Sequence, residues 1–152
     1  DGTSYFNDLE AQQMVSEIQA LDNKIHHFGA GKVTFDALVV APYNSQLKLI
    51  KNELSKRMPK YLNLEFNSVD AVQGKERDIV FFSTVRSNNN GQTGFLSATE
   101  YQRVNVALSR ARQLLVIVGD ANFWLNSDTR LGEVVDYIAA ASNLEIEAID
   151  AE

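Results

Sequence analysis

With 152 residues and 45% hydrophobic side chains, the chain is large enough for one domain with a buried core. The absence of cysteine excludes disulfides and thiolate metal sites. No apolar run approaches the roughly 18 residues that a membrane span needs. We therefore expect a cytoplasmic protein, or a nuclear one in a eukaryote. The formal net charge of -6 argues against bulk, charge-driven binding to nucleic acid, but it leaves room for a narrow groove with a few well-placed cations.

Hydrophobic periodicity predicts alternating helices and strands from the N-terminus onward. The first helix is expected over residues 7–25, with Asn7 or Asp8 as its N-terminal cap. A short buried strand follows at residues 37–41. Pro42 ends that strand, because proline cannot donate a backbone hydrogen bond to a neighbouring strand.

The next apolar stripe predicts a second helix that reaches Met58 and is closed by Pro59. A weak strand is expected at residues 64–69. The strand that follows, at residues 78–85, contains a continuous apolar run, which is typical of a strand covered on both faces in a parallel sheet.

A third helix is expected to start with Ser97 as its cap and to run through Arg110. Residues 114–118 then predict another fully buried strand. A last amphipathic helix is indicated by the apolar side chains Leu131, Val134, Val135 and Ile138. The acidic end, residues 143–152, fits either a further strand or a frayed tail.

This order of elements is typical of an α/β domain with a mostly parallel sheet. No domain boundary interrupts residues 1–152, so we expect a single domain, and the start without methionine suggests a piece of a larger protein. Ligands of such sheets bind beyond the carboxyl ends of the strands. The loops after Ala41, Val69, Val85 and Val118 are therefore the expected positions of a functional site.

One glycine-rich segment, GAGKVT at residues 29–34, invites comparison with a phosphate-binding loop. The full pattern needs a glycine where His26 stands and a serine or threonine where Val33 stands. The segment also precedes a strand, whereas a phosphate loop follows one. We therefore expect an ordinary turn and no phosphate loop in this chain.

Two arginines in the predicted third helix are candidates for binding an anion. Arg103 and Arg110 are seven residues apart, two helical turns, so they are expected to project in nearly the same direction. Guanidinium groups present planar, charge-assisted donors that suit a polyphosphate. Ion pairs with Glu100, Asp70 or Asp78 are the alternative, and spacing alone leaves both interpretations open.

A second candidate segment is the loop QGKER, residues 73–77, directly before a buried strand. Gly74 permits close approach of a ligand to the backbone, and Glu76 could accept hydrogen bonds from a ribose. Alone, this loop is only weak evidence for a ligand-binding site. Its combination with the two arginines is far more specific.

The segments that carry these residues resemble sequence blocks of a known family. SVDAVQGKERDIVFFSTVRSN, GFLS and RVNVALSRARQLLVIVGD together resemble the motif V and motif VI blocks of superfamily-1 helicases, in the branch of the nonsense-mediated-decay helicase and senataxin. VVAPYNSQ resembles the "PY..Q" block of that branch, and GTSYFNDLEA resembles its "SY.N..EA" block. The similarity covers almost the whole chain in the right order.

This resemblance implies the second, C-terminal RecA-like domain of a helicase, of P-loop NTPase type but without its own phosphate loop. In the family, ATP with Mg²⁺ binds between two such domains, and the N-terminal RecA-like domain supplies the phosphate loop and the metal-binding carboxylates. With two histidines and no cysteine, no metal ligands are expected here. The implied partners are that N-terminal domain and single-stranded RNA or DNA, and the fragment alone is expected to be monomeric and inactive.

The resemblance also implies roles for individual residues on the nucleotide side. Arg110 would be the arginine finger that reaches the γ-phosphate. Arg103 would support it or couple this block to the motif V loop. Glu76, with Gly74 and Gln73, would contact the ribose and the phosphate edge of the nucleotide.

On the nucleic-acid side, the implied residues lie at strand ends. Tyr43, with Pro42, and Ser68 would face the nucleic acid, where a tyrosine ring can stack on a base without reading sequence. Thr84 and Arg86 are candidates for contact with the nucleic-acid backbone. Their alternative roles are a strand-end cap and a solvated arginine.

A second class of function remains open beside the motor domain. The chain could be a free-standing α/β nucleic-acid-binding or regulatory module that keeps the fold without ATPase activity. A phosphate loop and an acidic magnesium motif upstream of Asp1 would distinguish the two.

Overall fold

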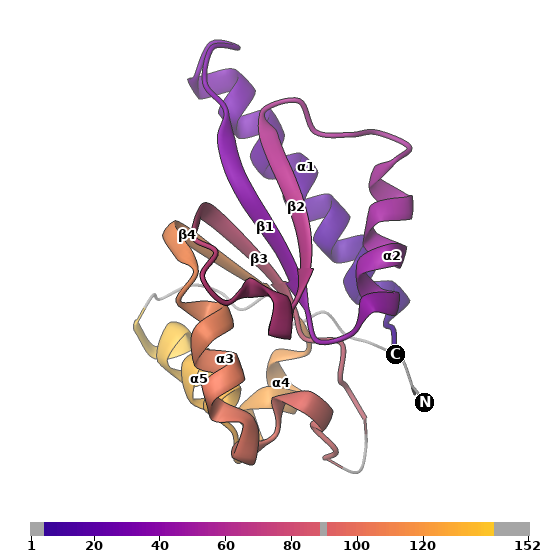
Figure 1. Ribbon diagram of the computed structural model, residues 1–152, viewed down its shortest axis with the longest axis vertical. Helices are drawn as coiled ribbons and strands as arrows, with labels where there is room; N and C mark the ends of the chain where they lie inside the picture. The colour runs from indigo at the N-terminus through magenta and orange to yellow at the C-terminus, as the bar shows by residue number, and fades with distance from the viewer. Residues whose placement is uncertain (1–4, 89–90, 142–152) are drawn as a thin grey trace.

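A computed structural model describes residues 5–88 and 91–141 and shows a three-layer α/β arrangement (Figure 1). Within these residues, the middle layer is a sheet of four parallel strands in the order β2-β1-β3-β4. The strands are β1 (Phe35–Ala41), β2 (Leu62–Ser68), β3 (Arg77–Ser83) and β4 (Ala111–Val118). The helices are α1 (Asp8–Phe28), α2 (Asn44–Leu54), α3 (Tyr101–Leu108), α4 (Ala121–Leu125) and α5 (Arg130–Ala141). Three short 3-10 turns lie in the connections: η1 (Val69–Val72), η2 (Gly94–Leu96) and η3 (Ala98–Glu100).

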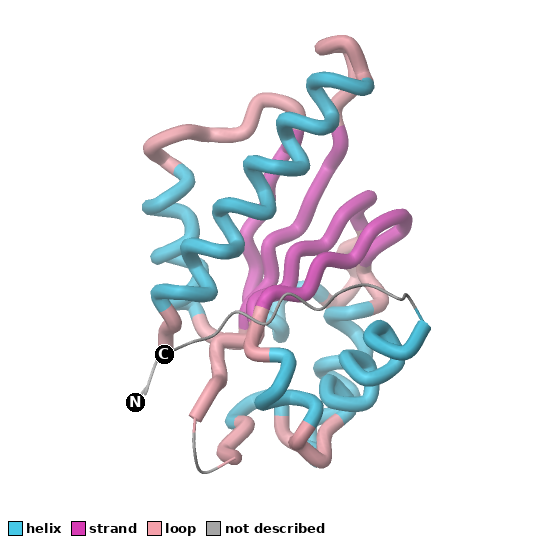
Figure 2. Tube along the Cα trace, turned by 180° about the vertical axis from the view of Figure 1, so that it is seen from behind, coloured by secondary structure: helices cyan, strands magenta, loops and turns pink. Residues whose placement is uncertain are grey.

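Helices cover both faces of the sheet. α1 and α2 pack on one face, and α3, with α5 against it, packs on the other (Figures 1 and 2). Successive side chains of a strand point to opposite faces. Val39 and Phe81 therefore pack under α1 and α2, whereas Val40 and Phe82 pack under α3. All four are fully buried, which confirms the predicted α/β class with a parallel sheet.

The local signals at the first helix are confirmed. Asn7 caps α1, because its side-chain oxygen accepts a hydrogen bond from the backbone N–H of Glu10 at 3.0 Å. The glycine-rich segment after α1 forms a turn over residues 29–31 that leads into β1, as predicted. None of the described helices combines the length and the apolar character needed to cross a bilayer.

The second helix is shorter than predicted. α2 ends at Leu54, and Met58 is exposed in the loop that follows. The side chain of Ser55 bonds back to the carbonyl of Asn52 and so competes with the helical pattern. The carboxylate of Asp22 then accepts the N–H groups of Lys60 and Tyr61, at 3.2 and 2.7 Å, which fixes the loop on α1.

The third helix also differs from its prediction at both ends. Ser97 precedes η3 and makes no side-chain capping bond, and α3 begins only at Tyr101. At the other end, Arg110 lies outside the helix, because its carbonyl accepts the N–H of Arg77 at 3.0 Å in a strand-like contact. Arg103 and Arg110 therefore do not share one helical face, contrary to the prediction.

The last predicted strand exists but is not fully buried. β4 pairs with β3, and in the part of the chain that the structure describes it forms the edge of the sheet. Leu114 is exposed, and Val118 is the buried residue of this strand. α4 was not predicted, and the expected final segment, residues 143–152, lies outside the described residues.

The carboxyl end of β4 gives a first testable prediction. A Cβ atom at Gly119 would overlap Oγ1 and Cγ2 of Thr84. Overpacking of this kind costs about 1–3 kcal/mol, so we expect Gly119→Ala to lower the free energy of unfolding in urea by that amount. Adding Thr84→Ser removes the Cγ2 methyl and should recover part of the loss. Unchanged stability of Gly119→Ala would show that the two segments do not approach so closely.

Candidate functional site

The candidate site residues fall into two sets at opposite ends of the sheet. The loop at residues 73–76 and Arg110 lie at the amino ends of β3 and β4, and the N–H of Arg77 joins the two segments through the carbonyl of Arg110. A functional site was expected in the loop after Val69, and residues 73–76 belong to that connection, but they lie at the amino end of β3 rather than at the carboxyl end of β2. The reason is the chain's path after β2, which returns through η1 to the start of β3. The second set, at the carboxyl ends, contains Pro42, Tyr43, Ser68, Thr84 and Arg86.

The loop before β3 is anchored to β2 by ion pairs. Lys75 Nζ lies 2.6 Å from Glu65 Oε1 and donates to Asn67 Oδ1 at 2.8 Å. A guanidinium nitrogen of Arg77 lies 2.8 Å from Glu65 Oε2. The hydrogen bond from Lys75 lowers the pKa of Glu65 below its usual value. Lys75 and Arg77 are therefore paired with groups of β2 and are not left to bind an anionic ligand.

The remaining residues of this loop are accessible to a ligand. Gly74 has a φ of +78°, which other residues rarely adopt, and no atom lies within 4 Å of where its Cβ would stand. Gln73 and Glu76 are exposed. No hydrogen bond or ion pair links the side chain of Glu76 to another described residue. The loop thus offers an open backbone cradle beside a carboxylate.

Arg110 is held by neutral groups. Its Nε donates to the carbonyl of Val106 at 3.0 Å, and an Nη donates to the hydroxyl of Ser109 at 2.8 Å. No carboxylate among the described residues forms an ion pair with it. A half-buried guanidinium without an anionic partner fits an anionic ligand.

Two other arginines, Arg103 and Arg112, do form ion pairs, which was the alternative interpretation of the arginines in this region. The Nε of Arg103 lies 3.1 Å from Glu100 and 3.4 Å from Asp70. Since Asp70 belongs to η1, this contact joins α3 to the segment that leads into the 73–76 loop. Arg112 pairs with Asp78 at 3.4 Å. Arg103 thus links α3 to η1 through an ion pair.

At the other end of the sheet, Tyr43 is covered by protein. It is only 6% exposed, and Pro42 beside it is also buried. The ring of Tyr5 packs against that of Tyr43, with centroids 5.3 Å apart and planes at 65°. Direct stacking of a base on Tyr43 would therefore require Tyr5 to move. Ser68 is half-buried at the end of β2.

Thr84 and Arg86 follow β3 and have different surroundings. Thr84 is fully buried, and its hydroxyl lies 3.3 Å from each carboxylate oxygen of Glu10, as expected of a strand-end cap. Arg86 is half-buried, with its guanidinium carbon 4.2 Å from the ring centroid of Tyr5. Of the two, Arg86 is the one within reach of a ligand.

Glu10 is a buried acid that the sequence interpretation did not single out. Its carboxylate accepts hydrogen bonds from the Ser83 hydroxyl at 2.9 Å and the Val85 N–H at 2.8 Å. Burial raises its pKa to about 7, although these hydrogen bonds act in the opposite direction. Glu10 thereby holds Val85 at a φ of 68°. Glu10 lies four residues before Met14, on the buried stripe of α1, and this position could have indicated from the sequence that its carboxyl group is buried.

Gln46 was also missed, although it is the glutamine of the "PY..Q" block. It is fully buried at the start of α2. Its amide accepts the N–H of Asn7 at 2.8 Å and donates to the carbonyl of Asn7 at 3.1 Å and to Ser83 at 3.2 Å. The segment before α1 is thus fastened to the carboxyl ends of β1 and β3.

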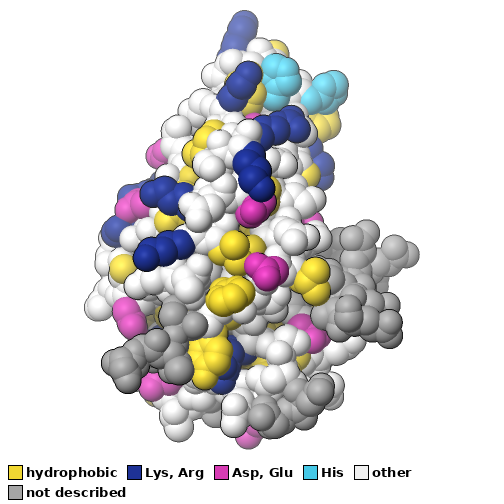
Figure 3. All heavy atoms as spheres, turned by 90° about the vertical axis from the view of Figure 1, so that its right-hand side faces the viewer, with side chains coloured by type: hydrophobic (Ala, Val, Ile, Leu, Met, Phe, Trp, Pro, Cys, Tyr) yellow, Lys and Arg dark blue, Asp and Glu magenta, His cyan; other side chains and the backbone are white. Residues whose placement is uncertain are grey.

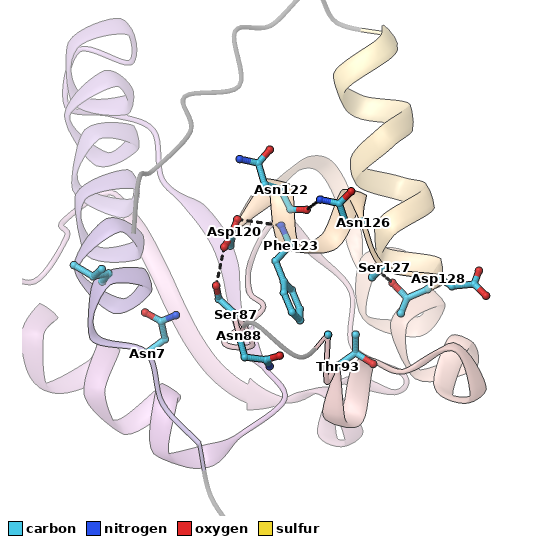
Figure 4. A pocket seen from close by; sticks show the side chains of 13 residues that line it. Asn7, Ser87, Asn88, Thr93, Asp120, Asn122, Phe123, Asn126, Ser127 and Asp128 are labelled. Atoms are coloured by element: carbon cyan, nitrogen blue, oxygen red, sulfur yellow. Dashed lines mark hydrogen bonds between the residues drawn. The ribbon is translucent and has the colours of Figure 1, made fainter. Parts of the chain in front are cut away.

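A polar hollow opens next to this segment (Figure 4). At its wall, Asp120 accepts the Ser87 hydroxyl at 2.7 Å and the Phe123 N–H at 3.1 Å, which ties the loops after β3 and β4 together. Its described lining contains no Lys or Arg. The hollow is therefore unsuited to a phosphate. Nor do three His, Asp or Glu side chains gather into a metal site anywhere in residues 5–88 and 91–141.

Comparisons with known proteins agree with this arrangement. Residues 1–122 match a family model described as an AAA domain. DNA-binding protein SMUBP-2 from Rattus norvegicus is 38% identical over 137 residues, which cover 90% of this chain and 13% of that protein. The regulator of nonsense transcripts 1 homolog from Neurospora crassa is 39% identical over 123 residues, 78% of this chain and 10% of that protein. Helicase sen1 from Schizosaccharomyces pombe is 34% identical over 151 residues, 98% of this chain and 9% of that protein.

These relatives are much longer than the chain, which spans between 9% and 13% of their lengths. The matched residues include the 73–76 loop and Arg110. The parallel sheet with helices on both faces is that of a RecA-like domain. The chain belongs to the superfamily-1 helicases, in the branch of the nonsense-mediated-decay helicase and senataxin.

Proposed function

We propose that the chain is the C-terminal motor domain of an ATP-dependent helicase or translocase that acts on single-stranded RNA or DNA. ATP would bind between this domain and an N-terminal RecA-like domain of the same protein. That domain would supply the phosphate loop and the carboxylates for Mg²⁺. This chain would supply an arginine finger and part of the nucleic-acid track.

The main support for the proposal is that the open loop at residues 73–76 lies next to Arg110, whose guanidinium has no carboxylate partner among the described residues. The backbone bond between Arg77 and Arg110 places the two segments side by side. Gly74 offers space for a polyphosphate, and the exposed Glu76 suits a ribose hydroxyl. Arg110 supplies positive charge that no described carboxylate neutralises.

The chemistry follows from these positions. When bound, ATP would supply the phosphoryl group that is transferred to water, and negative charge would spread over the phosphoryl oxygens in the transition state. Arg110 would stabilise that charge. Its Nε and one Nη are already fixed by Val106 and Ser109, so the guanidinium loses little side-chain freedom when it meets the phosphate. Arg103 would transmit the position of η1 to α3 through Asp70.

Glu76 provides the test on the nucleotide side. In the full-length protein, we expect Glu76→Gln to raise the KM for ATP about tenfold with little change in kcat, because a ribose contact is made equally in the ground and transition states. Steady-state hydrolysis in the presence of nucleic acid measures both constants. Glu133→Gln, an exposed acid on α5 that pairs with Arg130, is the matched control.

The domain assignment itself has a separate test. The 152-residue chain alone is expected to hydrolyse no ATP, whereas the full-length protein is expected to hydrolyse it faster when single-stranded nucleic acid is added. Hydrolysis by the isolated chain would contradict the proposal.

A further inference from the structure

The burial of Tyr43 raises the question of which aromatic surface at this end of the sheet can meet a base. Tyr5 and Phe6, directly before α1, are 42% and 62% exposed. We call these two residues the aromatic ledge. Figure 3 shows the face of the molecule that α1 and α2 form, where hydrophobic side chains reach the surface among charged ones.

The aromatic ledge is fixed rather than loosely attached. The Ser45 hydroxyl donates to the carbonyl of Tyr5. Gln46 bonds both the N–H and the carbonyl of Asn7, and the Asn7 side chain donates to the carbonyl of Val85 at 3.2 Å. The segment is therefore held between α2 and the end of β3. A rigid aromatic surface loses little entropy when a ligand stacks on it.

Arg86 provides a cation next to this surface. Its guanidinium stacks on the ring of Tyr5, and its Nε is buried with no hydrogen-bond partner in the described part of the chain. No ion pair links Arg86 to a described carboxylate, although the chain carries 20 Asp and Glu residues. An arginine that stacks on a tyrosine and keeps its charge unpaired suits a phosphodiester group.

We propose that the aromatic ledge stacks on bases of a single strand whose backbone phosphate lies on Arg86. Tyr43 then acts behind Tyr5 as support and does not touch the base. This inference rests on the proposed function, since it names residues of the nucleic-acid track. Stacking on aromatic rings is tolerant of sequence, because every base has a π-face.

An apolar segment of protein is the competing occupant of the ledge. The unpaired guanidinium favours nucleic acid over such a segment, because an apolar segment would leave the charge of Arg86 without a partner. The lining of the neighbouring hollow contains no Lys or Arg, whereas the guanidinium of Arg86 lies over the ring of Tyr5.

The test measures binding of fluorescein-labelled single-stranded DNA and RNA oligonucleotides to the full-length protein across a salt series. Phe6→Ala should weaken binding about 5- to 150-fold at every salt concentration, the range found for loss of one stacked base. Arg86→Gln should lower the slope of log affinity against log salt by about 0.7, as for one lost phosphate contact on a single strand. Tyr5→Leu, which keeps apolar bulk but removes the ring, should weaken binding as Phe6→Ala does.

The matched control is Phe28→Ala, at the far end of α1. Phe28 is 83% exposed and belongs to no proposed site, so this variant should bind as the unmodified protein does. Equal affinities of Phe6→Ala, Tyr5→Leu and Phe28→Ala would overturn the proposal. A lower melting temperature of Phe6→Ala with unchanged affinity would also overturn it and assign the ledge to a protein contact. Failure of the unmodified protein to bind nucleic acid would instead refute the proposed function.

Discussion

Arg110→Ala is expected to lower kcat for ATP hydrolysis by the full-length protein about 10³- to 10⁵-fold, with a much smaller change in KM. The reason is that an arginine finger acts on charge that develops only in the transition state. Arg110 has no described carboxylate partner, so its charge is available for this role. Single-turnover hydrolysis with saturating nucleic acid measures the effect.

Two further variants separate this role from a simple loss of positive charge. Arg110→Lys keeps the charge but removes the planar fork of donors, so it should restore only a small part of the rate. Arg112→Ala removes an exposed arginine two residues away that pairs with Asp78, and it should leave kcat within a fewfold of the unmodified protein. If Arg112→Ala matched Arg110→Ala, the loss would reflect the local fold rather than a finger.

Glu10 is expected to make the stability of the chain depend on pH. Its pKa is about 7 in the folded chain, against an ordinary value of 4.5 for a solvated glutamate, so the folded chain binds the proton more tightly than the unfolded chain does. Its contribution to stability is therefore fully present below pH 4.5 and is lost as pH rises to about 7. At about 1.4 kcal/mol per pKa unit, the loss amounts to about 3 kcal/mol.

The measurement is urea unfolding at pH 4.5 and pH 8 of the unmodified chain and of Glu10→Gln. The amide stays neutral, so the stability of the variant relative to the unmodified chain should increase by about 3 kcal/mol between the two pH values. Glu17→Gln, on the same helix but half-exposed, is the control for the other carboxylates. A difference between Glu10→Gln and the unmodified chain that stays constant with pH would show that the pKa of Glu10 is the same in the folded and the unfolded chain, which would contradict the raised value.

The type and order of most elements could be predicted, because periodicity reports which side chains are buried. β1 and β3 each contain a continuous apolar run, and α1 carries a regular stripe from Ala11 to Ile25 with Asn7 as its cap. The ends of elements could not be predicted in the same way. α2 and α3 stop where Ser55 and Ser109 bond back to preceding carbonyls, and local periodicity does not contain that information.

The sequence suggested which residues are candidates for the site, but not where they lie relative to one another. Residue spacing suggested one shared face for Arg103 and Arg110, yet the chain enters β4 immediately after Arg110 and separates them. After β2 the chain returns from the carboxyl end of the sheet to its amino end, and this return places the 73–76 loop before β3. The path of such a return is set by tertiary contacts, which the sequence pattern does not report. Tyr43 was expected to face a ligand; in the structure it is buried, and the ring of Tyr5, far from it in the sequence, packs against it.

The central claim is that Arg110 stabilises the transition state of phosphoryl transfer. Its most direct test is the affinity of the full-length protein for ADP with tetrafluoroaluminate, a transition-state analogue, compared with ADP alone. The unmodified protein should bind the analogue at least about a hundredfold more tightly than ADP. Arg110→Ala should lose most of that preference while its affinity for ADP stays the same, whereas an equal preference in both proteins would contradict the account.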